Sequence, residues 1–252
     1  MEPVGETALS SVGMGHRVLK FLQVEDLYDA TLSNAFFLCQ DAKLLLEGGS
    51  MGRARALAVL ALEECGKAIM IHKAKVTSFA LELPDPVLDD AFWKDWKTHL
   101  PKLRHVREFL IQNQYWFDVR PPEPNEFILG SVDEYLAELD RFAADGDTSK
   151  LKGLYVDVDP ATGKVVSPAD EASAEDVSEL LRMAHQIGWQ LRLGDHIEFI
   201  ASQRHTSRKS SPYSDYADGG PLARSRGERG WEAQDMELML MVSAMSDESD
   251  DA

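Results

Sequence analysis

The feature that most constrains the fold is a long segment, from Ser50 to about Phe79, whose apolar residues do not keep to one helical face. Its first half contains the unbroken apolar run Ala56–Leu62. A helix that is apolar on several sides is buried among other elements and does not lie on a surface. Ser50 is a suitable N-cap for it. The segment therefore predicts a central helix that other amphipathic helices surround.

Four further segments place apolar residues three and four positions apart, which is the period of an amphipathic helix. They cover Asp26–Leu46, Val87–Gln114, Val132–Ala144 and Ser173–Ser202. Pro101 lies inside the second of these segments, and a proline disfavours helix at and before its own position. We therefore expect that helix to be kinked or split near Thr98.

Three local signals refine this outline. Gly66 interrupts the predicted central helix at a cost of roughly 1 kcal/mol against alanine, which suggests the close approach of another helix. Ser173 followed by Asp176 resembles a capping box at the start of the last helix. In GLYVDVDPATGKVVSP (153–168), apolar residues alternate on both sides of the turn sequence DPATGK, which predicts a small β-hairpin.

The fold class expected from these patterns is all-α: a bundle of four to five long helices with a small β-hairpin insertion. We expect an N-terminal extension over residues 1–25 and a helical domain over residues 26–203. Residues 204–252 form a tail that is first basic and then acidic. Its Ser-, Gly- and Arg-rich part predicts disorder, and its apolar segment MELMLMV predicts a short helix.

Charge and cysteine content exclude several classes of protein. The chain has 43 acidic and 26 basic residues and a formal net charge of −17, which disfavours non-specific wrapping of nucleic acid or docking on an anionic membrane. Two cysteines cannot form a disulfide framework and suit a reducing compartment. No apolar run is long enough for a membrane span, and no secretory signal is visible. We expect a cytoplasmic protein with no membrane partner.

The first candidate for chemistry is ALEECGKA (61–68) in the predicted central helix. Glu63 and Lys67 stand four residues apart on one helical face, while Glu64 lies about 100° away. One of the two glutamates must therefore turn toward the buried side. The plain alternative is a surface ion pair worth roughly 0.3–0.5 kcal/mol.

The second candidate is KDWKTHLPKLRH (94–105), where His99 and Lys102 share a face three residues apart. The plain alternative here is a solvated basic face. Histidines in helical register for a metal, a His-Glu-x-x-His motif and a Gly-rich phosphate loop are all absent from the sequence. We therefore expect neither a metal nor a cofactor.

These two segments lead to one hypothesis about a site. Glu63, Glu64 and Lys67 would face His99 and Lys102 across neighbouring helices. A carboxylate can orient a histidine for acid–base work, and lysines can hold a phosphate. A buried polar network that stabilises the bundle would have the same composition, and the residue pattern leaves both readings open.

Taken together, the segments resemble the AbiV family of bacterial abortive-infection proteins, which is grouped with the HEPN helical domains. The resemblance covers roughly Tyr28–Gly194. It rests on NAFFLCQDAKLLLEGGSMGRARALAVLALEECGKA, FWKDWKTHLPKLR and LKGLYVDVDPATGKVVSP. It implies an all-helical core, a role in phage defence and activity directed at RNA. Many HEPN toxins are metal-independent ribonucleases that use Arg-x4–6-His, usually assembled across a homodimer.

This sequence lacks that nuclease motif, since none of its seven histidines has an arginine five to seven positions before it. Lys67 and Lys94 precede His72 and His99 at the right spacing, but lysine does not give the bidentate phosphate contact of arginine. The resemblance implies an effector that acts on RNA or translation after a phage protein engages it, whereas the missing motif favours binding over cleavage. The alternatives are a non-catalytic helical protein that sequesters a phage or ribosomal component, and a purely structural protein.

Overall fold

The computed structural model describes residues 19–113, 132–168 and 172–204, with side chains described as far as Asp195 in the last range. Within these ranges the chain forms six helices and one two-stranded hairpin. Their bounds are α1 Phe21–Glu47, α2 Met51–Ala80, α3 Asp90–Lys97, α4 His99–Gln112, α5 Val132–Leu154, β1 Asp157–Val158, β2 Val165–Val166 and α6 Ala174–Arg204. The all-α fold class with a small hairpin is confirmed. Residues 1–18 of the predicted N-terminal extension (1–25) and the tail beyond residue 204 lie outside the described residues. Residues 21–25 belong to α1, so this helix begins five residues before the expected start at Asp26.

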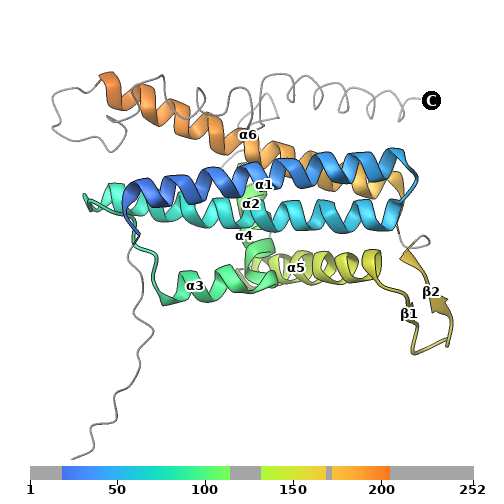
Figure 1. Cartoon of the computed structure of the whole chain (residues 1–252). Helices are drawn as coiled ribbons and strands as arrows, with labels where there is room; N and C mark the ends of the chain where they lie inside the picture. Colours follow the sequence, from blue (N-terminus) through green and yellow to red (C-terminus); the bar gives the residue numbers. More distant parts are fainter. Residues whose placement is uncertain (1–18, 114–131, 169–171, 205–252) are drawn as a thin grey trace, which may run out of the picture.

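Helix α2 is the centre of the bundle, as its apolar pattern predicts. It packs against α1, α4, α5 and α6. In Figure 1, α1 and α2 run side by side, with α6 on one side of this pair and α3 and α5 on the other. The chain reverses between α1 and α2 at Gly49, whose φ of 76° is the left-handed conformation that glycine adopts without strain.

The core follows the predicted helical faces. Buried apolar side chains of α1, α2, α4, α5 and α6 form one cluster, among them Tyr28, Leu62, Leu103, Ala143 and Ile187. Both cysteines, Cys39 and Cys65, are free thiols within this core. None of the helices among the described residues is long and apolar enough to cross a bilayer.

Three predicted local features are confirmed. Thr98 separates α3 from α4, because it is the C-cap of the first and the N-cap of the second. The amide of Ser173 donates to Asp176, whose own amide donates to the Ser173 hydroxyl, which completes the capping box. The hairpin pairs Asp157 with Val166 and Val158 with Val165 in antiparallel register.

The predicted end of the helix over Val132–Ala144 is wrong. This helix, α5, continues ten residues past Ala144 to Leu154. The sequence of this extension is polar and contains two glycines, so its periodicity is weak. Contacts with other helices, and not an amphipathic pattern, keep this extension helical. A Cβ on Gly146 would lie 3.0 Å from Leu103, and a Cβ on Gly153 would lie 2.3 Å from the carbonyl oxygen of Gly52. Such close packing requires the glycines that weaken the helical pattern.

Candidate functional site

Three side chains from two helices converge on the buried carboxylate of Glu63, in the middle of α2. Glu63 is 2% exposed. Its Oε2 accepts a hydrogen bond from Lys102 Nζ at 2.8 Å and lies 2.7 Å from His99 Nδ1. Its Oε1 accepts from Lys150 Nζ at 2.7 Å, and Lys150 also pairs with Asp147 at 2.8 Å. We call these five residues, Glu63, His99, Lys102, Asp147 and Lys150, the Glu63 cluster.

The close crossing of α2 and α4 explains how the cluster is assembled. A Cβ on Gly66 would lie 2.4 Å from the carbonyl oxygen of Lys102, so only glycine allows the two backbones to meet there. Glu63 lies one turn before Gly66 and therefore faces the start of α4. His99 and Lys102 stand three residues apart on α4, so both side chains reach the same carboxylate.

The side chains around this buried carboxylate keep it ionised. Burial alone would raise the pKa of Glu63, but the hydrogen bonds from Lys102, Lys150 and His99 outweigh it and lower the pKa from 4.5 to about 2. Burial would likewise lower the pKa of Lys150, yet its contacts with Asp147 and Glu63 raise it. At neutral pH the cluster therefore holds an ionised carboxylate with cationic lysines against it.

His99 connects this buried network to the surface, since its side chain is 54% exposed while that of Glu63 is 3% exposed. An ionised carboxylate accepts hydrogen bonds, so we assign the proton of this contact to Nδ1. That assignment leaves Nε2 as the ring nitrogen that can accept or donate a proton elsewhere. A histidine held this way by a carboxylate is a common arrangement for general acid–base catalysis.

The structure brings Glu63, His99 and Lys102 together but places Glu64 and Lys67 beside them, on the face of α2 toward α3. Lys67 pairs with Glu64 at 2.6 Å, and not with Glu63 four residues earlier. The Lys67 Nζ also lies 5.1 Å from the centre of the Trp96 ring on α3, within cation–π range. These two residues therefore extend the polar surface near the cluster without joining it.

Lys150 and Asp147 were absent from the sequence-based set of candidates. Both lie on the part of α5 that helical periodicity failed to predict. Their spacing of three residues is that of an ion pair on a helix, and this spacing is the one signal in the sequence that could have suggested them.

The ligand atoms of Glu63, His99 and Asp147 lie within 4.8 Å of one another, which is a spacing that a metal ion could use. The two lysines argue against this use. A divalent cation would have to displace ammonium groups that lie 2.7 and 2.8 Å from the Glu63 oxygens, or sit beside them at a large electrostatic cost. The donor set suits proton transfer by His99 better than it suits a metal.

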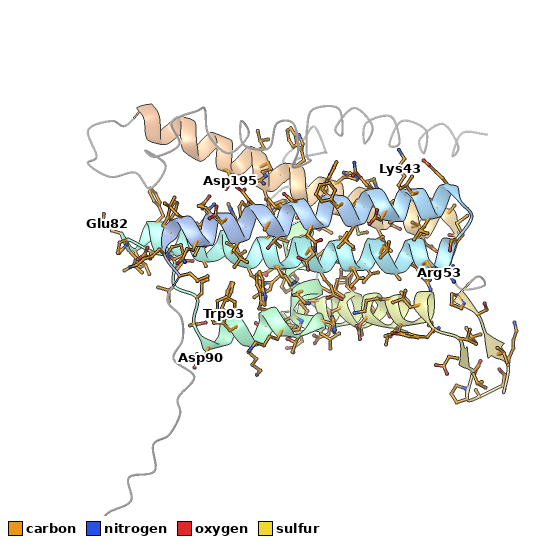
Figure 2. All side chains as sticks on the ribbon, in the orientation of Figure 1. Lys43, Arg53, Glu82, Asp90, Trp93 and Asp195 are labelled. Atoms are coloured by element: carbon orange, nitrogen blue, oxygen red, sulfur yellow. The ribbon has the colours of Figure 1, made fainter. Side chains whose placement is uncertain are left out.

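A second group of buried charges lies between α1, α2 and α6. Lys75 pairs with Glu25 at 2.7 Å and with Asp195 at 3.5 Å, and Arg192 pairs with Asp29 at 2.6 Å. In Figure 2, Asp195 lies on the α6 side of the bundle, opposite Trp93 of α3. These five charged side chains are all buried. The group therefore anchors α6 and is not open to a macromolecule.

Comparison with known proteins assigns most of the chain to a protein family. The family model of AbiV, within the HEPN group, matches residues 23–189, about two thirds of the chain. No curated protein and no solved structure matches. The matched range contains every residue of the Glu63 cluster and most of the six helices. By this match the chain belongs to the AbiV family of HEPN domains, whose role is abortive infection in defence.

Proposed function

We propose that this protein is an abortive-infection effector that acts on RNA through the Glu63 cluster. The observation that carries the proposal is the half-exposed His99 ring, held by an ionised and buried carboxylate that two lysines also contact. Of the two polar groups described above, the Glu63 cluster is the one that holds a titratable side chain, His99, at the surface in a fixed orientation.

The chemistry follows from the two ring nitrogens. Glu63 holds Nδ1, so Nε2 takes the proton of an RNA 2′-hydroxyl as the 2′-oxygen attacks the neighbouring phosphorus. The bond from phosphorus to the 5′-oxygen breaks, and solvent protonates that oxygen. The products are a 2′,3′-cyclic phosphate and a 5′-hydroxyl end. Each step uses protons alone, so the reaction needs no metal.

Basic side chains around His99 supply the local attraction for a phosphate that an acidic protein requires. Lys94 and Lys97 are exposed on α3, which leads directly into His99. Lys102 and Lys150 are buried, and their role is to keep Glu63 ionised and in place. Recognition of RNA would therefore be confined to this end of α3 and α4, since the whole chain has a net charge of −17.

A non-catalytic binding role is the second candidate, and the burial of the lysines favours it. Lys102 and Lys150 are each 5% exposed and paired, as expected of a polar network that stabilises a bundle. In that case the protein would sequester a phage or ribosomal component. In either case we propose that a phage protein triggers the response.

The test compares two histidines of α4 in a phage-sensitive host. His99→Ala removes the proposed acid–base group, and His105→Ala removes a ring that lies 3.5 Å from Glu108, away from the cluster. We expect His99→Ala to lose phage protection and His105→Ala to keep it, with the melting temperature of His99→Ala within a few degrees of the wild type. Full protection by His99→Ala would overturn the proposal. Parallel loss of protection and melting temperature would make the cluster structural.

We also propose a homodimer in the cytoplasm, as in HEPN nucleases whose sites form across two copies. Light scattering of the purified full chain measures the molecular mass in solution. A mass near 56 kDa, twice the 28.1 kDa of one chain, supports this proposal, and a mass of one chain at micromolar concentration contradicts it.

A further inference from the structure

We propose that the hairpin formed by β1 and β2 is the surface through which two copies of this chain associate. This inference rests on the homodimer proposed above and names the surface that forms it, and it is independent of the action on RNA. Figure 1 shows the hairpin projecting from the end of the bundle, beyond the last turn of α5. Its exposed apolar side chains, fixed position, open strand edges and local charge each favour this role.

The hairpin exposes apolar side chains to solvent. Val158 and Val165 are paired across the two strands, so their side chains lie side by side on one face. They are 53% and 59% exposed, and Tyr155 and Val156, just before β1, are exposed as well. Apolar patches of this kind on proteins mark interaction surfaces. A two-stranded hairpin is only marginally stable by itself, so it gains stability when another surface covers it.

Contacts at its base and in its turn fix the position of the hairpin. A Cβ on Gly52 would lie 2.0 Å from the carbonyl oxygen of Pro168, which follows β2. A Cβ on Gly153, which precedes β1, would lie 2.3 Å from the carbonyl oxygen of Gly52. Both ends of the hairpin therefore contact the start of α2. In the turn, Asp159 accepts a hydrogen bond from the amide of Ala161 at 2.8 Å. A surface fixed in this way loses little conformational entropy when a partner binds.

The open edges of the strands favour a second copy as the partner. The sheet has two strands, so each strand pairs on one edge only among the described residues, and an unpaired edge is a template for another strand. The same strand from two copies pairs antiparallel about a two-fold axis. Strand β2 suits this pairing because it consists of Val165 and Val166, whereas pairing through β1 would bring two copies of Asp157 together. The product is one four-stranded sheet, which is more stable than two separate hairpins.

Local charge permits this association, although the net charge of −17 makes two copies of the chain repel each other. Residues 152–168 contain two lysines, Lys152 and Lys164, and two aspartates, Asp157 and Asp159, so their formal charge is zero. Two hairpins therefore approach each other without the repulsion that acts over the chain as a whole.

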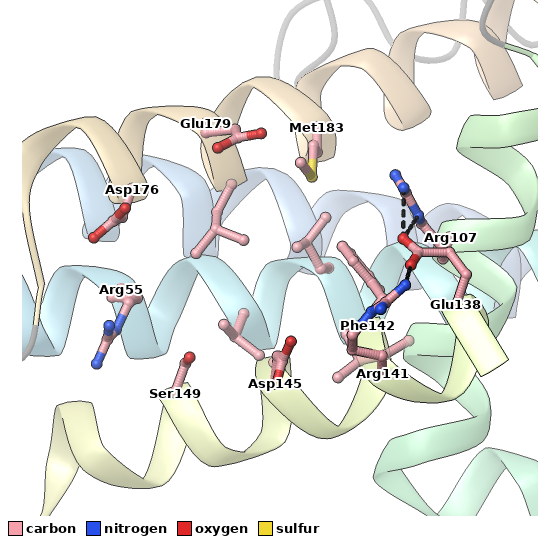
Figure 3. A pocket seen from close by; sticks show the side chains of 15 residues that line it. Arg55, Arg107, Glu138, Arg141, Phe142, Asp145, Ser149, Asp176, Glu179 and Met183 are labelled. Carbon is pink, nitrogen blue, oxygen red and sulfur yellow. Dashed lines mark hydrogen bonds and ion pairs between the residues drawn. The ribbon is translucent and has the colours of Figure 1, made fainter.

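Two other surfaces suit a second copy less well. At the opposite end of α2, Phe79 and Leu81 are exposed, but residues 81–93 contain four acidic residues and no basic residue. Figure 3 shows the cavity between α2, α5 and α6, which three arginines and four acidic residues line, so that its formal charge is −1. Both surfaces are negatively charged, and two copies would repel each other there.

The test measures the molecular mass of the full chain by light scattering over a range of concentrations. Val165→Lys places two ammonium groups close together in the proposed interface. Val87→Lys is the matched control, since Val87 is 58% exposed and its amide contacts Ser78 near the opposite end of α2. We expect the wild type and Val87→Lys to have a mass near 56 kDa, twice the 28.1 kDa of one chain. The dissociation constant of the Val165→Lys dimer should be ten-fold or more above that of the wild type.

A cysteine on β2 gives a second readout, which does not depend on weakening the dimer. The two native cysteines, Cys39 and Cys65, are buried, so an added surface cysteine is the one that mild oxidation reaches. Val165→Cys should form a covalent dimer, because paired strands bring the two Cα atoms within the roughly 4.4–6.8 Å that a disulfide spans. Val87→Cys should remain uncrosslinked at the same concentration.

The outcomes separate this surface from the homodimer itself. An unchanged dissociation constant for Val165→Lys, or equal crosslinking of the two cysteine variants, would overturn the hairpin interface and leave the homodimer standing. A wild-type chain with the mass of one copy at micromolar concentration would overturn both. The action on RNA is tested separately by the comparison of His99→Ala with His105→Ala.

Discussion

Glu63→Gln measures how much the ionised carboxylate of Glu63 contributes to the stability of the fold, because glutamine keeps the shape of the side chain and removes only its charge. The pKa of Glu63 falls from 4.5 to about 2 on folding. Each pH unit of such a difference corresponds to about 1.4 kcal/mol, so the ionised carboxylate contributes about 3 kcal/mol at neutral pH. Because Glu63 is 2% exposed, solvent screens this contribution little. Glutamine would also leave Lys102 and Lys150 buried without their counter-charge.

The sign of the pH dependence follows from the same values. A carboxyl group whose pKa is lower in the folded chain stabilises the fold above its unfolded pKa and loses this effect as the pH falls. The stability gap between wild type and Glu63→Gln should therefore be about 3 kcal/mol at pH 7. It should begin to shrink below about pH 5 and reach roughly half its value near pH 3.

The assay is urea unfolding followed by helical circular dichroism, repeated from pH 7 to pH 3. Glu64→Gln is the matched control, since it changes the next residue of the helix and affects only the partly exposed pair with Lys67. That pair should contribute no more than about 1 kcal/mol. A gap for Glu63→Gln below 1 kcal/mol at pH 7, or one that does not change with pH, would refute this reasoning.

Three further predictions concern packing, capping and thiol chemistry. Gly66→Ala should destabilise the fold by about 1–3 kcal/mol in urea unfolding, because the new Cβ meets the Lys102 carbonyl at 2.4 Å; unchanged stability would contradict the tight helix crossing. Ser173→Ala should cost about 1 kcal/mol by removing the acceptor of the Asp176 amide, and thermal melts that match the wild type would contradict the capping role. Burial raises the pKa of Cys39 to about 12, so this thiol should stay unmodified by a thiol reagent at pH 8 in the folded chain and react on unfolding; rapid modification of the native chain would show that it is accessible.

Sequence patterns predicted the helices whose apolar faces are continuous. The central position of α2, the break at Thr98 and the capping box before α6 each follow from a local signal that tertiary structure reinforces. The end of α5 did not follow, because the polar residues after Ala144 are held in a helix by contacts with α2 and α4. Periodicity cannot register contacts between residues that are distant in the sequence.

The same limit applies to the site. Glu63, His99 and Lys102 could be chosen because each lies on a strongly patterned helix, and Gly66 indicated that another helix passes close. The choice between Glu63 and Glu64 as the buried residue could not be made from spacing alone, since both lie near the edge of the apolar face. Lys150 belongs to the part of α5 that the sequence pattern did not predict, so it could not be chosen.

Sequencing of RNA ends in infected cells tests most directly whether the Glu63 cluster cleaves RNA during infection. Cells that express the wild-type chain and the His105→Ala chain should accumulate new 5′-hydroxyl ends after infection. Cells that express His99→Ala at the same level should not. New RNA ends that appear equally with His99→Ala, or phage protection by the wild type without any new ends, would contradict the claim.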